Sequence, residues 1–126
     1  MRTMDKSVVP KKIFVVDDDV FIGNILKIIL ESERYRVSPF TTGRSALQLC
    51  SKKIPDLLIL DYFLMGENFS EVIHGFKSKR GENFPIILMS ANKVPIDIVK
   101  EYKIREFVEK PFQRDTIVAA VIRNLN

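Results

Sequence analysis

The chain has 126 residues, of which 46% are hydrophobic and 29% are charged. This length suits one compact domain, and this apolar share is enough for a core, which argues against a chain that is disordered at rest. The net charge of +4 reflects a mild basic excess, and the clusters at Lys11–Lys12, Lys52–Lys53 and Lys77–Arg80 are not interleaved with aromatic residues. We therefore interpret them as solvated helix faces and loops rather than as a nucleic-acid-binding surface.

The single cysteine, Cys50, precludes a disulfide within the chain and fits a reducing compartment. It stands among apolar residues, so we interpret it as a small core residue. No apolar run approaches the length of a membrane span, and residues 1–12 lack the apolar stretch of a signal peptide. We expect a cytoplasmic protein with one domain over residues 1–126, in which residues 1–11 form a flexible N-terminal extension.

Short apolar runs alternate with helical patterns along the chain. The runs are rich in β-forming residues and too short for helices, whereas the helical segments repeat apolar residues at helical spacing. In chain order we expect strand Ile13–Val16, helix Ile22–Leu30, strand Arg36–Phe40, helix Gly43–Lys52, strand Leu57–Leu60, helix Val72–Phe76, strand Ile86–Met89, a weak helix Ile96–Tyr102, strand Glu106–Glu109 and helix Ile117–Leu125.

This alternation predicts βαβ units and therefore a parallel sheet. Continuously apolar strands are typical of a sheet that helices cover on both faces. With right-handed crossovers, five such strands suit a flavodoxin-like, doubly wound α/β fold with strand order 2-1-3-4-5. In that order the first and third strands are neighbours, and ligands bind beyond their carboxyl ends.

Polar and charged residues follow four of the five expected strands. They are Asp17–Asp19, Asp61, Ser90 and Lys110. Parallel strands would bring them to one edge of the sheet, where clustered carboxylates repel unless a cation joins them. A hard cation with oxygen ligands, Mg²⁺ (or Mn²⁺), fits these residue types. Zinc fits poorly, because His74 and Cys50 lie in helical segments away from this edge.

An aspartate beside Mg²⁺ can attack phosphorus and form an aspartyl phosphate. We hypothesise that Asp61 is this nucleophile, that Lys110 and the metal offset the charge of the phosphoryl oxygens, and that Ser90 donates a hydrogen bond to one of them. Simpler roles exist for the same residues. Asp17–Asp19 could cap the next helix, a role we assign to Asp19, while Asp61 could be a turn residue and Ser90 could bond its own backbone.

The sequence resembles response-regulator receiver domains from Lys11 to Leu125. The resemblance rests on four motifs in order, each at the end of an expected strand: FVVDDD (Phe14–Asp19), LLILD (Leu57–Asp61), ILMSA (Ile87–Ala91) and FVEKPF (Phe107–Phe112). It implies a chemotaxis-regulator-like domain of two-component signalling that receives a phosphoryl group from a sensor histidine kinase or a histidine phosphotransfer protein. Its surface would then switch for a downstream effector protein or domain.

The resemblance also implies that the domain promotes its own phosphorylation and dephosphorylation without turning over an external substrate. From the charge pattern and the lack of a long apolar run we expect no direct binding of nucleic acid or membrane, and the resemblance allows a phosphorylation-dependent homodimer. A stand-alone regulator and a receiver excised from a longer protein are both compatible with the sequence.

Each matching position takes a role from the resemblance. The implied metal ligands are Asp18 directly, Asp17 through water, Asp61, and the backbone carbonyl of Phe63. The implied phosphoryl and switch residues are Asp61 as phosphoacceptor, Lys110 as the phosphoryl-binding lysine, Ser90 as the switch hydroxyl and Phe107 as an aromatic that changes rotamer on activation. The family's usual cis bond before proline is expected at Lys110–Pro111.

Two segments depart from the family pattern. Leu64–Met65 stands where Met-Pro is usual and Phe69 where glycine is usual, although Gly66 can supply the turn. Lys103–Ile104 replaces the Gly-Ala that would end the fourth helix, so we expect that helix to be short, shifted or mobile.

Three alternative functions can be weighed from the sequence. The unusual loop after Asp61 supports a degenerate receiver that acts as a phosphorylation-independent binding scaffold. An aspartyl phosphatase is disfavoured because Phe63 stands where such enzymes carry a second aspartate. A flavin-binding protein is disfavoured because three carboxylates, rather than small and hydroxyl residues, follow the first strand.

Overall fold

The structure is a computed structural model, in which residues 9–125 are described. Its strands and helices alternate as predicted. In chain order they are β1 (Lys12–Val16), α1 (Val20–Glu31), β2 (Arg36–Phe40), α2 (Gly43–Leu49), β3 (Leu57–Asp61), α3 (Phe69–Arg80), β4 (Ile86–Ser90), α4 (Ile96–Glu101), β5 (Glu106–Glu109) and α5 (Arg114–Leu125). Of the extension predicted for residues 1–11, residues 1–8 lie outside the described residues.

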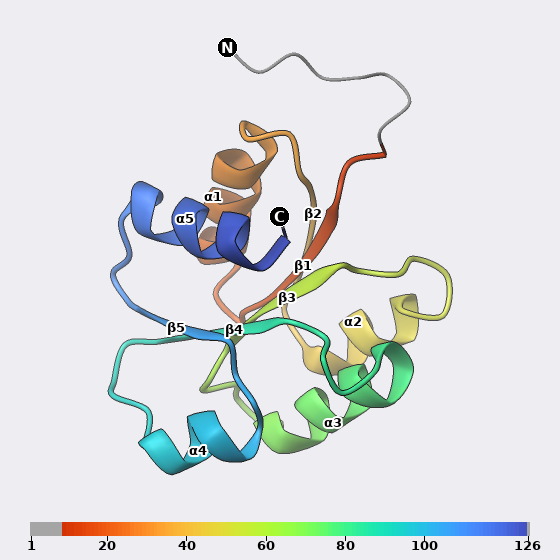
Figure 1. Cartoon of the computed structure of the whole chain (residues 1–126), viewed down its shortest axis with the longest axis vertical. Coiled ribbons are helices and arrows are strands. Elements are labelled where there is room, and N and C mark those ends of the chain that lie inside the picture. Colours follow the sequence, from red (N-terminus) through yellow and green to blue (C-terminus); the bar gives the residue numbers. More distant parts are fainter. Residues whose placement is uncertain (1–8, 126) are drawn as a thin grey trace.

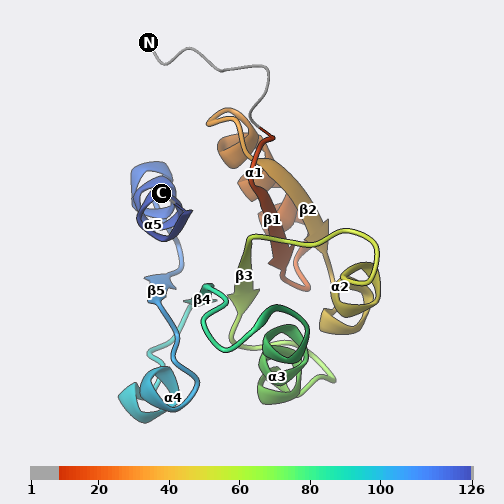
Figure 2. The same cartoon turned by 45° about the vertical axis from the view of Figure 1, so that its right-hand side comes forward.

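The five strands form one parallel sheet in the order β2-β1-β3-β4-β5, which confirms the predicted topology. Helices α1 and α5 cover one face of the sheet, and α2, α3 and α4 cover the other (Figures 1 and 2). The two faces carry separate apolar clusters because successive strand residues point to opposite sides, as Phe14 and Val15 do. Cys50 is buried in the cluster under α2 and α3, as predicted.

Short polar side chains begin the first three helices. The carboxylate of Asp19 accepts a hydrogen bond from the backbone N–H of Phe21 at 2.9 Å, which confirms that Asp19 caps α1. Thr42 and Asn68 cap α2 and α3 in the same way. The predicted end of the second helix at Lys52 is wrong: α2 ends at Leu49, whose carbonyl accepts from both Lys52 and Lys53 N–H groups in a turn.

Helix α4 is short, as predicted, and ends without glycine. Lys103 takes the left-handed conformation with φ = +53°, while its N–H bonds to the carbonyl of Lys100 at 3.2 Å. The N–H of Ile104 bonds to the carbonyl of Val99 at 2.9 Å, and both side chains pack in the same apolar cluster. This pairing is a Schellman motif, in which lysine occupies the position that usually holds glycine.

Lys77 corrects the prediction that Lys77–Arg80 is a solvated cluster. Its side chain is buried, and its ammonium donates to the carbonyl oxygens of Tyr102 at 2.8 Å and Glu82 at 3.2 Å. The long apolar stem allows the lysine to pass between α3 and the end of α4 while its charge stays hydrogen-bonded. Among residues 9–125, no helix is both long and apolar enough to cross a membrane.

Candidate acidic site at the carboxyl ends of the strands

Two buried aspartates lie side by side where β1 and β3 end. The register pairs Val16 with Leu60, so Asp17 and Asp61 emerge at the same level of the sheet. Asp17 is 1% exposed and Asp61 is 7% exposed. The parallel order of β1 and β3 thus brings two carboxylates that are 44 positions apart in sequence into one buried place.

The ammonium of Lys110 lies between these two carboxylates. Its Nζ is 2.7 Å from Oδ2 of Asp17 and 3.3 Å from Oδ2 of Asp61. The backbone N–H of Lys110 bonds to the carbonyl of Ser90 at 2.8 Å, which fixes this residue at the end of β4. The Lys110–Pro111 bond is cis, as the resemblance implied.

The charges of Asp17, Asp61 and Lys110 affect one another strongly. Burial raises the pKa of Asp61, the charge of Asp17 raises it further, and Lys110 opposes both. Burial lowers the pKa of Lys110, but the hydrogen bond and charge of Asp17, together with the charge of Asp61, outweigh burial and leave that pKa above its ordinary value. A further positive charge beside Asp61 would therefore relieve an unfavourable buried carboxylate.

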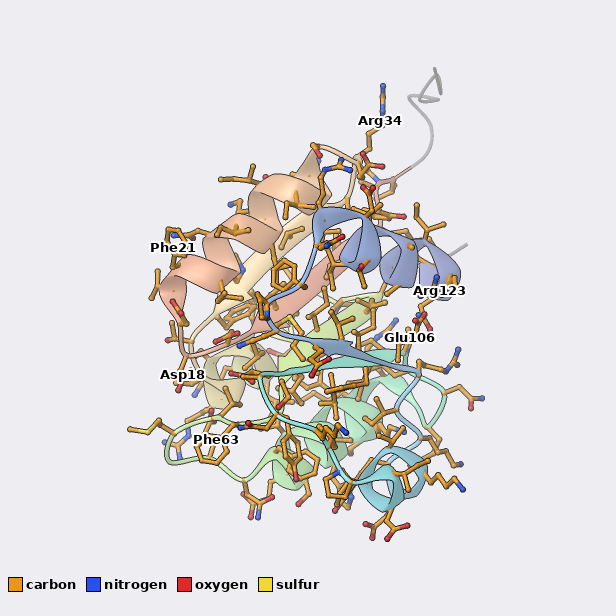
Figure 3. All side chains as sticks on the ribbon, turned by 90° about the vertical axis from the view of Figure 1, so that its left-hand side faces the viewer. Asp18, Phe21, Arg34, Phe63, Glu106 and Arg123 are labelled. Carbon is orange, nitrogen blue, oxygen red and sulfur yellow. The ribbon has the colours of Figure 1, made fainter. Side chains whose placement is uncertain are left out.

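Asp18 completes a set of three acids that fits a metal ion. Asp17, Asp18 and Asp61, hereafter the acidic site, each offer a carboxylate oxygen within 4.8 Å of the others. Asp17 and Asp61 are buried, whereas Asp18 is exposed at the edge that Phe63 also borders (Figure 3). Carboxylate oxygens with access to water are the donor set that Mg²⁺ prefers, so these residues fit the ion that the sequence predicts.

The unusual loop between β3 and α3, residues 62–68, is held against the acidic site. The N–H of Phe63 bonds to Oδ1 of Asp61 at 3.3 Å, and the N–H of Met65 bonds to Oδ2 of Asp18 at 3.4 Å. Gly66 supplies the turn with φ = +73°, and the N–H of Glu67 closes it on the carbonyl of buried Leu64 at 3.4 Å. A backbone role for the Phe63 carbonyl stays a prediction.

Ser90 is the last residue of β4, and Phe107 lies on the neighbouring strand β5; their switch roles stay predictions. Ser90 is buried at the end of β4, and its hydroxyl oxygen accepts from the N–H of Asn92 at 3.0 Å, the local bond of the simpler interpretation. Such a hydroxyl keeps its own hydrogen to donate. The Phe107 ring lies outside both apolar clusters and is 36% exposed, so it is not a core residue.

Two features near the site escaped the sequence analysis. The ring of Phe69, which replaces the usual glycine, packs on Tyr62 with centroids 4.8 Å apart and on Tyr102 at 5.3 Å. The carboxylate of Glu67 accepts from the backbone N–H groups that begin α2. The contacts of Glu67 with α2 and of Phe69 with Tyr102 have no local signal, because the sequence separates each pair by more than 20 positions. The contact of Phe69 with Tyr62 spans only seven positions, but it depends on how the loop folds.

A doubly wound α/β sheet with aspartates at the carboxyl ends of β1 and β3 and a lysine after β5 defines a class of signalling domain. The chain belongs to the response regulator receiver domain family, whose model matches residues 13–122. Domains of this family are signalling modules and are not turnover enzymes on external substrates.

Solved receiver structures share this fold. The chemotaxis protein CheY4 of Vibrio cholerae is 22% identical, with a TM-score of 0.85 over 93% of this chain and 100% of that chain. The HemR receiver domain of Leptospira biflexa is 26% identical, with a TM-score of 0.81 over 92% and 94%. The response regulator TrrA of Thermotoga maritima, solved in complex with Mg²⁺-BeF, is 30% identical, with a TM-score of 0.79 over 91% and 99%.

Proposed function

We propose that this chain is a phosphorylation-dependent receiver that accepts a phosphoryl group on Asp61 from a sensor histidine kinase or a histidine phosphotransfer protein. The observation that carries the proposal is the placement of the Asp61 carboxylate, which lies within 4.8 Å of its two acidic neighbours and 3.3 Å from the Lys110 ammonium. Carboxylates that share one site with an ammonium are suited to a metal-assisted nucleophile.

Each residue of the site takes one part in the transfer. Asp18, Asp61 and the Phe63 carbonyl would hold Mg²⁺ (or Mn²⁺), with Asp17 acting through water. The ion would supply positive charge for the phosphoryl oxygens. A carboxylate oxygen of Asp61 attacks phosphorus in line, the bond from phosphorus to the donor imidazole nitrogen breaks, and that nitrogen keeps the electron pair and takes up a proton.

The residues around Asp61 then respond to the new charge. Lys110 moves from Asp61 toward a phosphoryl oxygen, and the Ser90 hydroxyl donates its own hydrogen to another. Phe107 follows into the space that this rearrangement leaves, which shifts an existing equilibrium toward an active surface on α4, β5 and α5. This surface is the proposed contact for a downstream effector or for a second copy of the chain. Hydrolysis of the acyl phosphate resets the domain.

The test compares wild type with Asp61→Asn. Both proteins are incubated with a small phosphodonor such as acetyl phosphate, with and without Mg²⁺, and the gain of one phosphoryl group is followed by intact mass. We expect a gain for wild type that requires Mg²⁺ and is absent from the variant. Asp97→Asn, which makes the same change at an exposed residue of α4, serves as the matched control and should label like wild type.

Equal labelling of wild type and Asp61→Asn would overturn the assignment of the phosphoacceptor. No labelling of wild type, under conditions where a second receiver domain reacts, would favour the alternative of a binding scaffold that works without phosphorylation.

A further inference from the structure

The carboxylate that bonds to the first turn of α2 comes from another part of the chain. This helix has no acidic residue in its own first turn, and its cap, Thr42, satisfies only the N–H of Ser45. The N–H groups of Gly43 and Arg44 donate instead to the two carboxylate oxygens of Glu67, at 2.7 and 3.0 Å. A carboxylate is favourable here because the free N–H groups give a helix N-terminus partial positive charge.

Glu67 belongs to the loop of residues 62–68, whose backbone N–H groups bond to the carboxylates of the acidic site. Its own N–H closes the turn at Gly66 on Leu64, and the same turn presents the N–H of Met65 to Asp18. Phe63, which stands at the start of the loop, donates to Asp61. Because this turn is short and closed, displacing Glu67 would displace the backbone that faces Asp18 and Asp61.

The start of α2 is a fixed support for this attachment. A Cβ atom at Gly43 would lie 2.5 Å from a methyl group of Val72, so the first residue of α2 packs directly on α3. Ala46, one turn further, is fully buried under the sheet. Both carboxylate oxygens of Glu67 therefore bond to the backbone at the start of α2, and this backbone is packed too closely to move with Glu67.

We propose that Glu67 is a positioning residue for the acidic site: its two hydrogen bonds to the start of α2 hold the loop after Asp61 in the geometry that binds Mg²⁺. This inference rests on the proposed function, since it assumes that Mg²⁺ binds at Asp18 and Asp61. The coupling is reciprocal, so Mg²⁺ binding stabilises the hydrogen bonds at the start of α2 as much as those bonds favour the metal.

The test measures Mg²⁺ binding to the whole chain by calorimetric titration with the metal alone. Glu67→Gln keeps the shape of the side chain but loses one acceptor oxygen and the charge. We expect its Mg²⁺ affinity to fall by about threefold to tenfold, less than the roughly 10–100-fold typical of residues that bond a metal ligand directly. Glu71→Gln removes the same charge from the exposed first turn of α3 and should stay within about twofold of wild type, the range expected without a ligand-positioning contact.

Amide hydrogen exchange gives a second readout. In wild type, Mg²⁺ should slow exchange at Gly43 and Arg44, and in Glu67→Gln these two amides should exchange faster and respond less to Mg²⁺. If Glu67 served stability alone, the variant would unfold more easily while its Mg²⁺ affinity stayed unchanged. Should Glu67→Gln fail to fold, Glu67→Asp keeps the carboxylate on a shorter arm and should show a smaller loss of affinity in the same direction.

The outcomes separate this inference from the proposed function. Wild type that binds Mg²⁺ beside a folded Glu67→Gln of equal affinity would overturn the positioning role alone. Wild type that binds no Mg²⁺ would overturn the metal site of the proposed function, and the positioning role with it.

Discussion

The ammonium of Lys77 on α3 donates a hydrogen bond of 2.8 Å to the carbonyl oxygen of Tyr102, the residue that caps the end of α4. A second bond reaches the carbonyl of Glu82. Burial lowers the pKa of Lys77, yet the partial negative charge at a helix C-terminus favours a cation there. This buried lysine joins α3 to the end of α4, a region that belongs to the proposed output surface.

Replacing Lys77 by methionine should destabilise the domain. The variant keeps the apolar stem but leaves the carbonyl oxygens of Tyr102 and Glu82 without this donor, which costs about 1–3 kcal/mol of unfolding free energy. Urea denaturation measures the loss. Lys79→Met makes the same change at an exposed position of α3 and should alter stability by less than about 0.5 kcal/mol. Equal effects of the two substitutions would show that the hydrogen bonds of Lys77 contribute nothing.

Replacing Lys103 by glycine should stabilise the domain. Lysine in the left-handed conformation costs about 1–2 kcal/mol, and glycine removes this cost while losing about 0.5–1 kcal/mol through the entropy of the unfolded chain. The net gain should be about 0.5–1 kcal/mol in urea denaturation. Lys100→Gly, within the regular part of α4, should instead cost about 1 kcal/mol. A loss of stability in Lys103→Gly would contradict this account of the Schellman motif.

The sequence predicted the sheet well because its information is local. Runs such as Leu57–Leu60 and Ile86–Met89 are apolar without alternation, and this pattern indicates a buried parallel strand wherever it occurs. The general rule for the carboxyl ends of such strands then predicts that Asp17 and Asp61 meet at one edge of the sheet. The closeness of these two aspartates can therefore be predicted without knowing how the side chains pack.

Contacts between residues that are distant in the sequence follow no such rule. Lys77 stands in a run of basic residues, and only the position of Tyr102, 25 residues later, makes it a buried residue. Glu67 and Gly43 are 24 residues apart, and nothing near either residue indicates the other. Phe69 departs from the family pattern in the sequence, but its packing on Tyr102 depends on how α3 and α4 meet.

Glu106 should make stability depend on pH. Its carboxylate on β5 accepts from Arg123 at 2.5 and 2.9 Å and from Asn124 at 2.8 Å, and Glu106 and Arg123 lie together in Figure 3. The Arg123 hydrogen bonds hold the pKa of Glu106 below its ordinary value. A carboxyl group whose pKa falls on folding stabilises the fold above its unfolded pKa, and this stabilisation is lost as pH falls through the folded pKa.

Glu106→Gln should therefore be less stable than wild type at pH 7 by about 0.5–1 kcal/mol, since Arg123 is largely exposed. The difference should shrink as pH falls below the ordinary glutamate pKa of about 4.3 and through the lower pKa of the folded carboxyl group, where wild type becomes protonated. Denaturation at a series of pH values measures this difference. Glu109→Gln, exposed on the same strand, is the control and should show little difference at any pH. A Glu106→Gln difference that does not shrink as the pH is lowered would exclude the charge as its cause.

The acidic site should cost stability until a metal ion binds. Because burial and the charge of Asp17 raise the pKa of Asp61, folding favours its protonated form, and stability is lost as pH rises through that pKa. At pH 7 without metal, Asp61→Asn should thus raise the free energy of unfolding by about 1 kcal/mol, as substitutions that relieve a functional site often do. Lys110 keeps its shorter bond to Asp17, at 2.7 Å, in this variant, and the loss of its longer ion pair with Asp61, at 3.3 Å, offsets only part of the gain.

Mg²⁺ should reverse the order of stability of wild type and Asp61→Asn. At about 100 times its dissociation constant, the ion stabilises a protein that binds it only when folded by about 2.7 kcal/mol, so wild type should become more stable than Asp61→Asn, which lacks the carboxylate ligand. Chelator and saturating Mg²⁺ are compared in urea denaturation, with the exposed residue Asp97 changed to asparagine as the control. Equal stabilisation of wild type and Asp61→Asn by Mg²⁺ would place the ion elsewhere, because a ligand shifts stability only through the contacts that it makes in the folded state.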